Sequence, residues 1–210
     1  MKTIIKILLV MATIMTASCG NAESPTESGN GKTLIVFYSF TGNCEAIVNT
    51  LRSQINADVV EIWPAEEGLD YSADNYAIGS ALIAAIRENP DKAESYPTIK
   101  PVDVNLEEYS SIIVVAPLWW DNMAAPLQAY LFHNGEKMSG KHIGLIVSSW
   151  SSGIDDVVAD AHRLIPGGRF FIKPLWINHT GQSNRDNLIS AWLNEIDYSA
   201  IASYDINVLR

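Results

Sequence analysis

The chain has 210 residues, a length that suits one medium-sized domain with a well-buried core. Hydrophobic residues make up 48% of it and charged residues only 18%, a balance typical of globular rather than disordered chains. The formal net charge of −10 argues against a nucleic-acid partner and against a basic surface that binds membranes.

The first residues have the pattern of a signal peptide. Lys2 and Lys6 precede an apolar run, residues 7–14, that is too short to span a membrane, and small residues follow it. Cys19 comes directly after the small residues. This order is similar to a bacterial lipoprotein signal, which implies that residues 1–18 are removed and that Cys19 is lipidated. Cleavage nearby that leaves a free cysteine is the alternative.

The next segment is polar. Residues 19–32 contain Gly, Ser, Pro and Glu and have no apolar face, so we expect Cys19 to be followed by a flexible tether. The folded domain is expected over residues 33–197 and a C-terminal tail over residues 198–210. The leader predicts an exported cell-envelope lipoprotein that faces the periplasm or the cell surface and meets the membrane only through its lipid anchor.

From residue 33 onward, strand and helix patterns alternate. Apolar runs predict strands buried in a parallel sheet, and apolar residues at helical spacing predict helices between them. Strands are predicted at residues 33–38, 58–62, 111–117, 142–148 and, as one bent strand, 169–172 with 174–177; helices are predicted at residues 42–55, 71–88, 122–133, 154–165 and 183–196. Pro126 falls in the first turns of its helix, Pro174 bends the fifth strand, and Ser183 is the expected cap of the last helix.

This alternation predicts an α/β fold, a three-layer sandwich around a doubly wound, five-stranded parallel sheet. Ligands of such folds bind beyond the carboxyl ends of the strands. Three polar or aromatic loops fall at those ends, at residues 39–44, 118–123 and 149–153. We therefore expect one binding site built from these three loops.

The first loop follows the first strand and leads into a helix. It reads Ser39, Phe40, Thr41, Gly42, Asn43 and Cys44. A phosphate needs donors of this kind, namely hydroxyls, backbone N–H groups and the positive end of a helix dipole, and a glycine lets the backbone approach closely. A capped helix start without a ligand explains so short a motif equally well.

The second loop carries two adjacent tryptophans, Trp119 and Trp120, which cannot both point into one packed face beyond a strand. A flat, electron-rich ring suits stacking on a planar cofactor, and an aromatic surface patch for partner docking is the alternative. The third loop, residues 148–153, is rich in serine around Trp150. A strand end with serine as a helix cap accounts for it without a ligand.

Together the three loops resemble those of the flavodoxin family, over residues 33–196. The first matches the pattern Thr/Ser-x-Thr-Gly-x-Thr, with Cys44 in place of the last threonine. The second resembles a Pro-Ile-Trp-Trp-Gly loop, with Asp121 in place of glycine, and the third resembles Thr-x-Gly-Gly-Ser-Gly. The resemblance implies a flavodoxin-like sheet with strand order 2-1-3-4-5.

The resemblance also implies FMN as the cofactor. The residues that it assigns to FMN binding are Ser39, Phe40, Thr41, Gly42, Asn43, Cys44, Pro117, Leu118, Trp119, Trp120, Asn122, Met123, Ser149, Trp150, Ser151 and Gly153. Trp120 matches the stacking aromatic, and Trp150 is a candidate to cover the second flavin face. We expect the charge of Asp121 to lower the redox potential. Reactivity of Cys44 as a thiolate is not expected beside a bound phosphate.

Other reactive side chains give weaker signals. We predict neither a disulfide framework nor a metal cluster, because Cys19 and Cys44 stand in unlike contexts and the histidines lack ligand spacing. His133, His142 and His162 are expected at the surface. A surface position is also expected for His179, with a place at the cleft as the alternative.

We therefore predict an FMN-binding, flavodoxin-like electron-transfer protein in which no side chain need act as acid or base. One alternative is an enzyme, an NAD(P)H-dependent quinone or nitro-compound reductase. Another is a flavodoxin-fold binding module that has lost FMN. The expected partner is a redox protein or a small-molecule acceptor, and the chain is expected to be a monomer or a weak dimer.

Overall fold

Two long apolar strands form the centre of the sheet. In the computed structural model, which describes residues 31–201, they are β1 (Lys32–Phe37) and β3 (Tyr109–Trp119), and they pair in parallel. The predicted signal peptide, Cys19, nearly all of the tether and the last nine residues lie outside the described residues.

The remaining strands extend the sheet on both sides. β2 (Asp58–Glu61) pairs with β1, and β5 (His142–Ser148) pairs with β3, both in parallel. β6 (Arg169–Phe170) and β7 (Leu175–Ile177) each pair with β5 and together form the predicted fifth strand. The path β2-β1-β3-β5-β6 is the doubly wound order 2-1-3-4-5, so the predicted fold class is confirmed.

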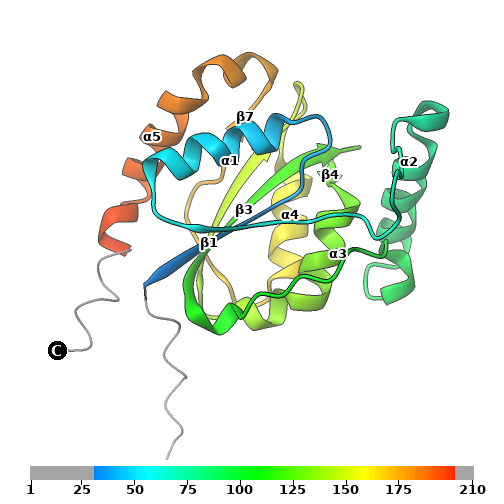
Figure 1. Cartoon of the computed structure of the whole chain (residues 1–210), viewed down its shortest axis with the longest axis horizontal. Helices are drawn as coiled ribbons and strands as arrows, with labels where there is room; N and C mark the ends of the chain where they lie inside the picture. Colours follow the sequence, from blue (N-terminus) through cyan, green and yellow to red (C-terminus); the bar gives the residue numbers. More distant parts are fainter. Residues whose placement is uncertain (1–30, 202–210) are drawn as a thin grey trace, which may run out of the picture.

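Helices cover both faces of this sheet (Figure 1). α1 (Asn43–Gln54) and α5 (Arg185–Glu195) lie on one face. α3 (Ala125–Asn134) and α4 (Asp155–Leu164) lie on the other, with α2 (Ala73–Glu88) beside α3. Short 3-10 turns complete the chain: η1 (Ala93–Ser95), η2 (Leu106–Glu108), η3 (Gly135–Met138) and η4 (His179–Asn184).

Alternation along the strands separates two cores. Leu34 and Val36 of β1 belong to the core under α2, α3 and α4, whereas Ile35 and Phe37 belong to the core under α1 and α5. All four side chains are buried. Because successive side chains of a strand point to opposite faces, a continuous apolar run is what a sheet covered on both sides requires.

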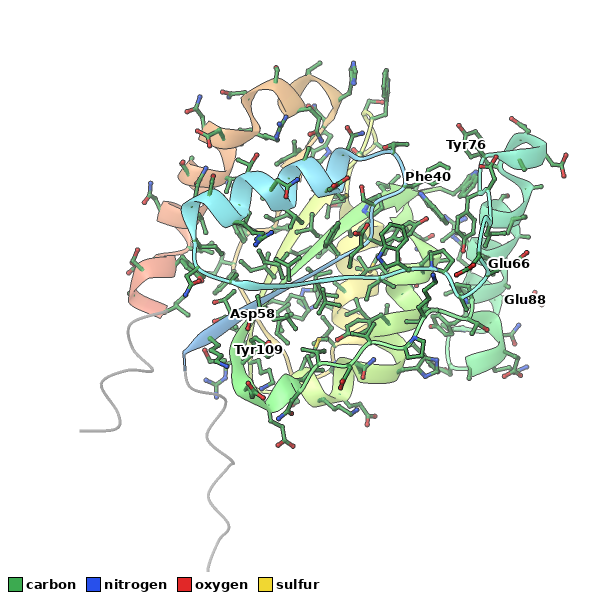
Figure 2. All side chains as sticks on the ribbon, in the orientation of Figure 1. Phe40, Asp58, Glu66, Tyr76, Glu88 and Tyr109 are labelled. Atoms are coloured by element: carbon green, nitrogen blue, oxygen red, sulfur yellow. The ribbon has the colours of Figure 1, made fainter. Side chains whose placement is uncertain are left out.

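Side-chain hydrogen bonds join segments of this sheet that are far apart in the sequence. The Tyr109 hydroxyl donates to Asp58 Oδ2 at 2.9 Å, which joins β3 to β2 across β1 (Figure 2). Tyr198, just after α5, packs into the second core, and its hydroxyl lies 2.7 Å from Thr33 Oγ1.

Among residues 31–201, no helix is both long and apolar enough to cross a bilayer.

Among the helix starts that differ from the prediction, those of α3 and α5 have a clear cause; α2 begins at Ala73 rather than at residue 71, and its residues 74–76 have left-handed φ angles. The helix predicted from residue 122 begins at Ala125, because Asn122 and Met123 form a short strand, β4 (Asn122–Met123), antiparallel to the end of β3. Ser183 is not the cap of the last helix. It lies within η4, its hydroxyl bonds to the Thr180 carbonyl oxygen at 3.4 Å, and the N-cap position belongs to Asn184.

A buried carboxylate fixes the hairpin formed by β3 and β4. Asp160 of α4 is 7% exposed, and its Oδ2 accepts hydrogen bonds from Asn122 Nδ2 at 2.9 Å and from the Met123 amide at 3.0 Å. Its Oδ1 pairs with Arg163 Nη2 at 3.1 Å. Gln128 completes the network, because it donates to the Met123 carbonyl oxygen and accepts from Arg163.

We predict that Asp160→Asn lowers the free energy of unfolding by about 3 kcal/mol, because it leaves Arg163 without its anion and turns an amide toward the donors of β4. Urea unfolding measures the loss. Asp156→Asn is the matched control on the exposed face of α4, with an expected change within about 0.5 kcal/mol. Equal losses in the two variants would contradict the role given to the network.

Candidate cofactor-binding cleft

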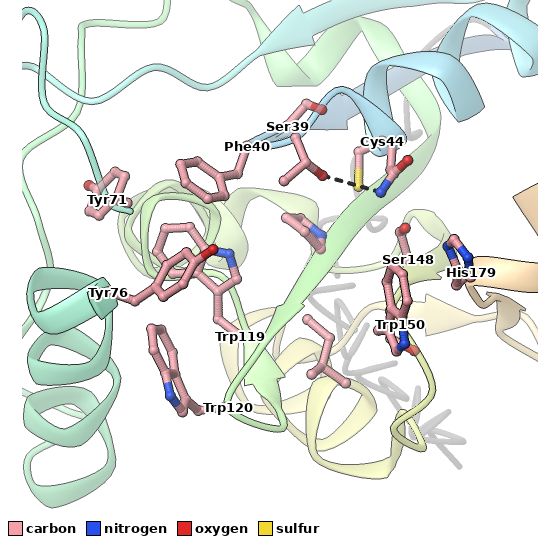
Figure 3. Close-up of a pocket in the computed structure, with 16 residues that line it drawn as sticks. Ser39, Phe40, Cys44, Tyr71, Tyr76, Trp119, Trp120, Ser148, Trp150 and His179 are labelled. Atoms are coloured by element: carbon pink, nitrogen blue, oxygen red, sulfur yellow. Dashed lines mark hydrogen bonds between the residues drawn. The ribbon is translucent and has the colours of Figure 1, made fainter. Parts of the chain in front are cut away.

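The three predicted loops meet at the carboxyl ends of the strands around a cavity of about 510 Å³ (Figure 3). This volume lies within the range of small-molecule sites. We call this cavity the aromatic cleft. The predicted site residues that line it are Ser39, Phe40, Thr41, Asn43, Cys44, Pro117, Leu118, Trp119, Trp120, Ser149 and Trp150.

The cleft also has walls that the sequence did not predict. Tyr71, Tyr76 and Gly79 line it, and so does His179, which takes the position held open as the alternative; Ser148, part of the third predicted loop but not assigned to FMN binding, lines it too. In contrast, five predicted residues do not line it, namely Gly42, Asn122, Met123, Ser151 and Gly153. Met123 is fully buried in the core.

The first loop presents helix amides to the cleft. Gly42 has φ +82°, a left-handed conformation that suits glycine, and its carbonyl accepts from the Ala46 amide at 2.9 Å. The Glu45 amide donates to Ser39 Oγ at 3.2 Å. The amides of Asn43 and Cys44 precede these and have no helix carbonyl four residues back, so they are free to bind an anion.

Cys44 is a buried, neutral thiol. Its side chain is 1% exposed and packs in the core under α1, and burial raises the pKa of the thiol. A raised pKa keeps sulfur protonated at neutral pH, which opposes nucleophilic or redox chemistry. Burial is thus a second reason, beside a bound phosphate, to expect no thiolate chemistry at Cys44.

The second loop is a tight hairpin. Trp119 pairs with Asn122, and the two residues between them, Trp120 and Asp121, have φ values of +45° and +70°. Two positive φ angles in a two-residue hairpin are the mark of a type I′ turn, which favours Asn-Gly. This backbone explains why glycine suits the position of Asp121, whose exposed side chain does not line the cleft.

The two tryptophans diverge from this hairpin. Trp119 turns inward, where its ring centroid lies 5.6 Å from that of Tyr38, 5.8 Å from that of Phe40 and 4.9 Å from that of Tyr71, each in an edge-on arrangement. Trp120 lies against α2 and stays partly exposed. The adjacent rings therefore build two different walls of the cleft (Figure 3).

Helix α2 holds the hairpin from the outside. A Cβ on Gly79 would lie 3.0 Å from Cζ3 of the Trp120 ring, so the bare backbone of this glycine makes room for the indole. Two turns further along, Arg87 donates to the Trp120 carbonyl oxygen and, at 2.5 Å, to Asn122 Oδ1. Steric contact and hydrogen bonds thus fix where the Trp120 ring lies.

The third loop is braced by η4 and β7. Trp150, 73% exposed, stacks on His179 with ring centroids 3.7 Å apart and an interplanar angle of 18°. The His179 amide donates to the Trp150 carbonyl oxygen at 3.0 Å. Trp176 Nε1 donates to Ser149 Oγ at 2.8 Å, and Gln182 Nε2 donates to Ser148 Oγ at 3.1 Å. An exposed tryptophan is therefore held in one orientation at the rim.

The electrostatics of the cleft suit a ligand with one anionic end and a flat body. No Asp, Glu, Lys or Arg side chain of the described residues lines it. The anion would meet helix amides and the hydroxyls of Ser39 and Thr41, while the body would meet Trp119, Trp120 and Trp150. FMN has this combination of phosphate and planar ring, so the residues present fit it. Residues 31–201 contain no group of three or more His, Cys, Asp or Glu side chains that could hold a metal ion.

Comparisons with known proteins identify relatives of this fold. A family model described as Flavodoxin matches residues 32–196. A candidate flavoprotein from Bacteroides eggerthii has a TM-score of 0.61 and 22% identity over 79% of this chain and 98% of its own. A flavoprotein from Lactobacillus acidophilus, solved in complex with FMN, has a TM-score of 0.59 and 20% identity over 77% of this chain and 97% of its own. The search of curated proteins gave no match. At such identities the structural matches establish a shared fold.

We predict that Gly79→Ala displaces the Trp120 ring, because the added Cβ would meet it at 3.0 Å. The near-UV circular dichroism of the tryptophans should change, and FMN affinity should fall about fivefold, the size of one misplaced aromatic contact. Ser80→Ala, on the exposed neighbouring position of α2, is the control and should change neither quantity. Unaltered dichroism in Gly79→Ala would refute this placement of the ring.

Proposed function

Because the chain belongs to the flavodoxin family, as its three loops predicted, we propose that it binds FMN in the aromatic cleft and serves as an electron-transfer protein. Family membership supports FMN as the cofactor. The observation that carries the proposal is the meeting of three loops, far apart in the sequence, around one cavity that has an anion cradle and aromatic walls.

The first loop would hold the phosphate. The amides of Asn43 and Cys44 and the hydroxyl of Thr41 are its donors, and Asn43 Nδ2 orients Thr41 Oγ1 by a hydrogen bond at 3.2 Å. Since no carboxylate within residues 31–201 lines the cleft, the loop places no like charge next to a dianion. Glu45 also lies in the first turn of α1, and its amide is already bonded to Ser39 Oγ.

The second and third loops would enclose the ring system. When bound, FMN supplies one- or two-electron redox chemistry through its ring. Trp119 and Trp120 form the wall on the side of α2, and Trp150, held by His179, forms the rim on the other side. These side chains orient the ring, exclude water from it and set the polarity around it. None of them has to move a proton.

The charge of the cleft favours a carrier over an NAD(P)H-dependent reductase. No lysine or arginine of the described residues lines the aromatic cleft, so the phosphates of NAD(P)H would find no cation there. The formal net charge of −10 adds a general repulsion toward dinucleotides. We propose a redox protein or a small acceptor as partner, and the leader supports a place in the cell envelope.

Purification and reduction test this function. The purified chain should be yellow, with FMN released on denaturation in a ratio near one per chain. Under anaerobic conditions the colour should persist with NADPH and bleach with dithionite. Rapid bleaching by NADPH would contradict the carrier role and indicate a reductase. A colourless protein that takes up no added FMN would contradict FMN binding and indicate a binding module.

We predict that Cys44→Thr binds FMN about tenfold more tightly, because a hydroxyl donates to a phosphate more strongly than a thiol does. Fluorescence quenching of added FMN measures the dissociation constant. Cys44→Ala is the matched control, since it removes the thiol without adding a donor, and it should not tighten binding. Equal or weaker binding by Cys44→Thr would count against a contact between residue 44 and the phosphate.

A further inference from the structure

A second cavity adjoins the aromatic cleft. Its volume is about 460 Å³, and it lies over the loop between β2 and α2. Ser39, Phe40 and Tyr71 line both cavities, so these residues form the wall between them. The ring centroids of Phe40 and Tyr71 lie 6.3 Å apart in an edge-on arrangement. A molecule in the second cavity would therefore be separated from the aromatic cleft by little more than two aromatic side chains.

The loop that forms the outer wall is built as a fixed structure. Its carbonyl at Trp63 accepts from the Lys100 amide at 2.8 Å, the Ala65 amide donates to the Thr98 carbonyl oxygen at 3.0 Å, and Pro64 bridges to Ile99. These contacts make a short antiparallel ribbon beyond the edge of the sheet. The ribbon carries Trp63, which is 53% exposed and lines the cavity.

The walls of the second cavity are aromatic. Tyr38, Phe40, Trp63 and Tyr71 line it together with Leu69. Aromatic faces carry negative potential, so a cavity lined by several of them attracts flat rings and organic cations. An exposed tryptophan in a fixed loop is well suited to cover one face of such a ligand.

A polar group without a partner marks the inner wall. Tyr71 is 2% exposed, and its hydroxyl has no hydrogen-bond partner among the described residues. Burial, and then the nearby charge of Glu66, raise the pKa of this tyrosine to about 12, so the hydroxyl keeps its proton. The hydroxyl is sheltered from solvent, so Tyr71 meets the cavity through its ring rather than through its hydroxyl.

The charges at the mouth favour a cation. Glu66, Glu67 and Lys100 line the cavity, and Lys100 Nζ lies 3.5 Å from Glu67 Oε1. Glu66 has no ion pair within the described residues, which leaves one carboxylate in excess. Figure 2 shows Glu66 at the same end of the molecule as Phe40 and Tyr76. An anionic ligand would meet this excess charge as a repulsion.

From these contacts we infer that the second cavity binds a flat aromatic cation. Trp63, Phe40 and the ring of Tyr71 would contact the flat ring, and Glu66 would face its positive charge. Binding of this kind does not depend on FMN. If the proposed function holds, the site places a small redox partner next to the cofactor.

A matched pair of probes tests the ligand class. 1-Methylnicotinamide is a planar cation with a carboxamide oxygen, and nicotinamide is its neutral counterpart. Each is titrated into the full chain, once saturated with FMN and once without FMN, and the indole N–H signals are followed by ¹H–¹⁵N NMR. The Trp63 signal should shift and the Trp150 signal should stay in place. The cation should bind about threefold more tightly than the neutral probe, the size expected of one exposed charge contact.

Neutralising Glu66 and neutralising Lys100 should change the affinity for the cation in opposite directions. Glu66→Gln should weaken binding of 1-methylnicotinamide about threefold, and Lys100→Gln should strengthen it by a similar factor. Glu136→Gln, an exposed carboxylate on η3, is the control and should have no effect. Trp63→Leu keeps an apolar side chain without an aromatic face and should weaken the cation about fivefold. Its melting temperature shows whether the variant is folded, and the isosteric Glu66→Gln provides an independent test.

Three results would overturn the inference. Equal affinity for the two probes would show that charge plays no part in binding. Tighter binding of the cation by Lys100→Gln is expected; weaker binding there, with tighter binding by Glu66→Gln, would indicate that the cavity prefers an anion. Loss of the Trp63 shift when FMN is bound would place the probe in the aromatic cleft instead. Because the titration is also done without FMN, the second cavity can still be tested if the chain proves not to bind FMN.

Discussion

The buried carboxylate of Asp160 is the contact on which the cleft depends. It accepts from Asn122 and from the Met123 amide, and so it holds the base of the hairpin that carries both tryptophans. A buried charge is tolerated only where it is paired, and Arg163 supplies that pairing while also donating to the Tyr96 hydroxyl at 2.8 Å. The site is thus tied to α4 and to the segment before β3. A change in that distant network would reach the aromatic walls.

Backbone strain gathers at the same place. Trp120 and Asp121 have positive φ in the hairpin, and Asp74, Asn75 and Tyr76 have positive φ at the start of α2, opposite it. Residues without glycine's freedom hold such angles at a cost of about 1–3 kcal/mol each, and only where the surroundings over-determine them. Here α2 supplies that constraint through its contacts with the hairpin. Trp120 of the hairpin and Tyr76 of α2, both strained, thus line the cleft together.

The sequence predicts this fold well because its signals are local. Residues 142–148 show an apolar run with sharp ends, and β5 has the same bounds. The β3–β4 hairpin was missed because Asn122 and Met123 resemble a helix start when Pro126 follows, and their partner Asp160 is remote in sequence. Gly79 was missed for a similar reason. Helical spacing shows that α2 has a buried face, but only the folded hairpin shows that an indole lies on it.

The departures from the family pattern bear on whether the cleft still binds FMN. Cys44 fills a core position, so its replacement of threonine keeps the loop packed while removing one donor. Asp121 sits at the tip of a turn and does not line the cleft, and Trp150 stacks on His179 at the rim. Each departure is accommodated by its local surroundings, so the residues that line the cleft still fit a phosphate and a planar ring.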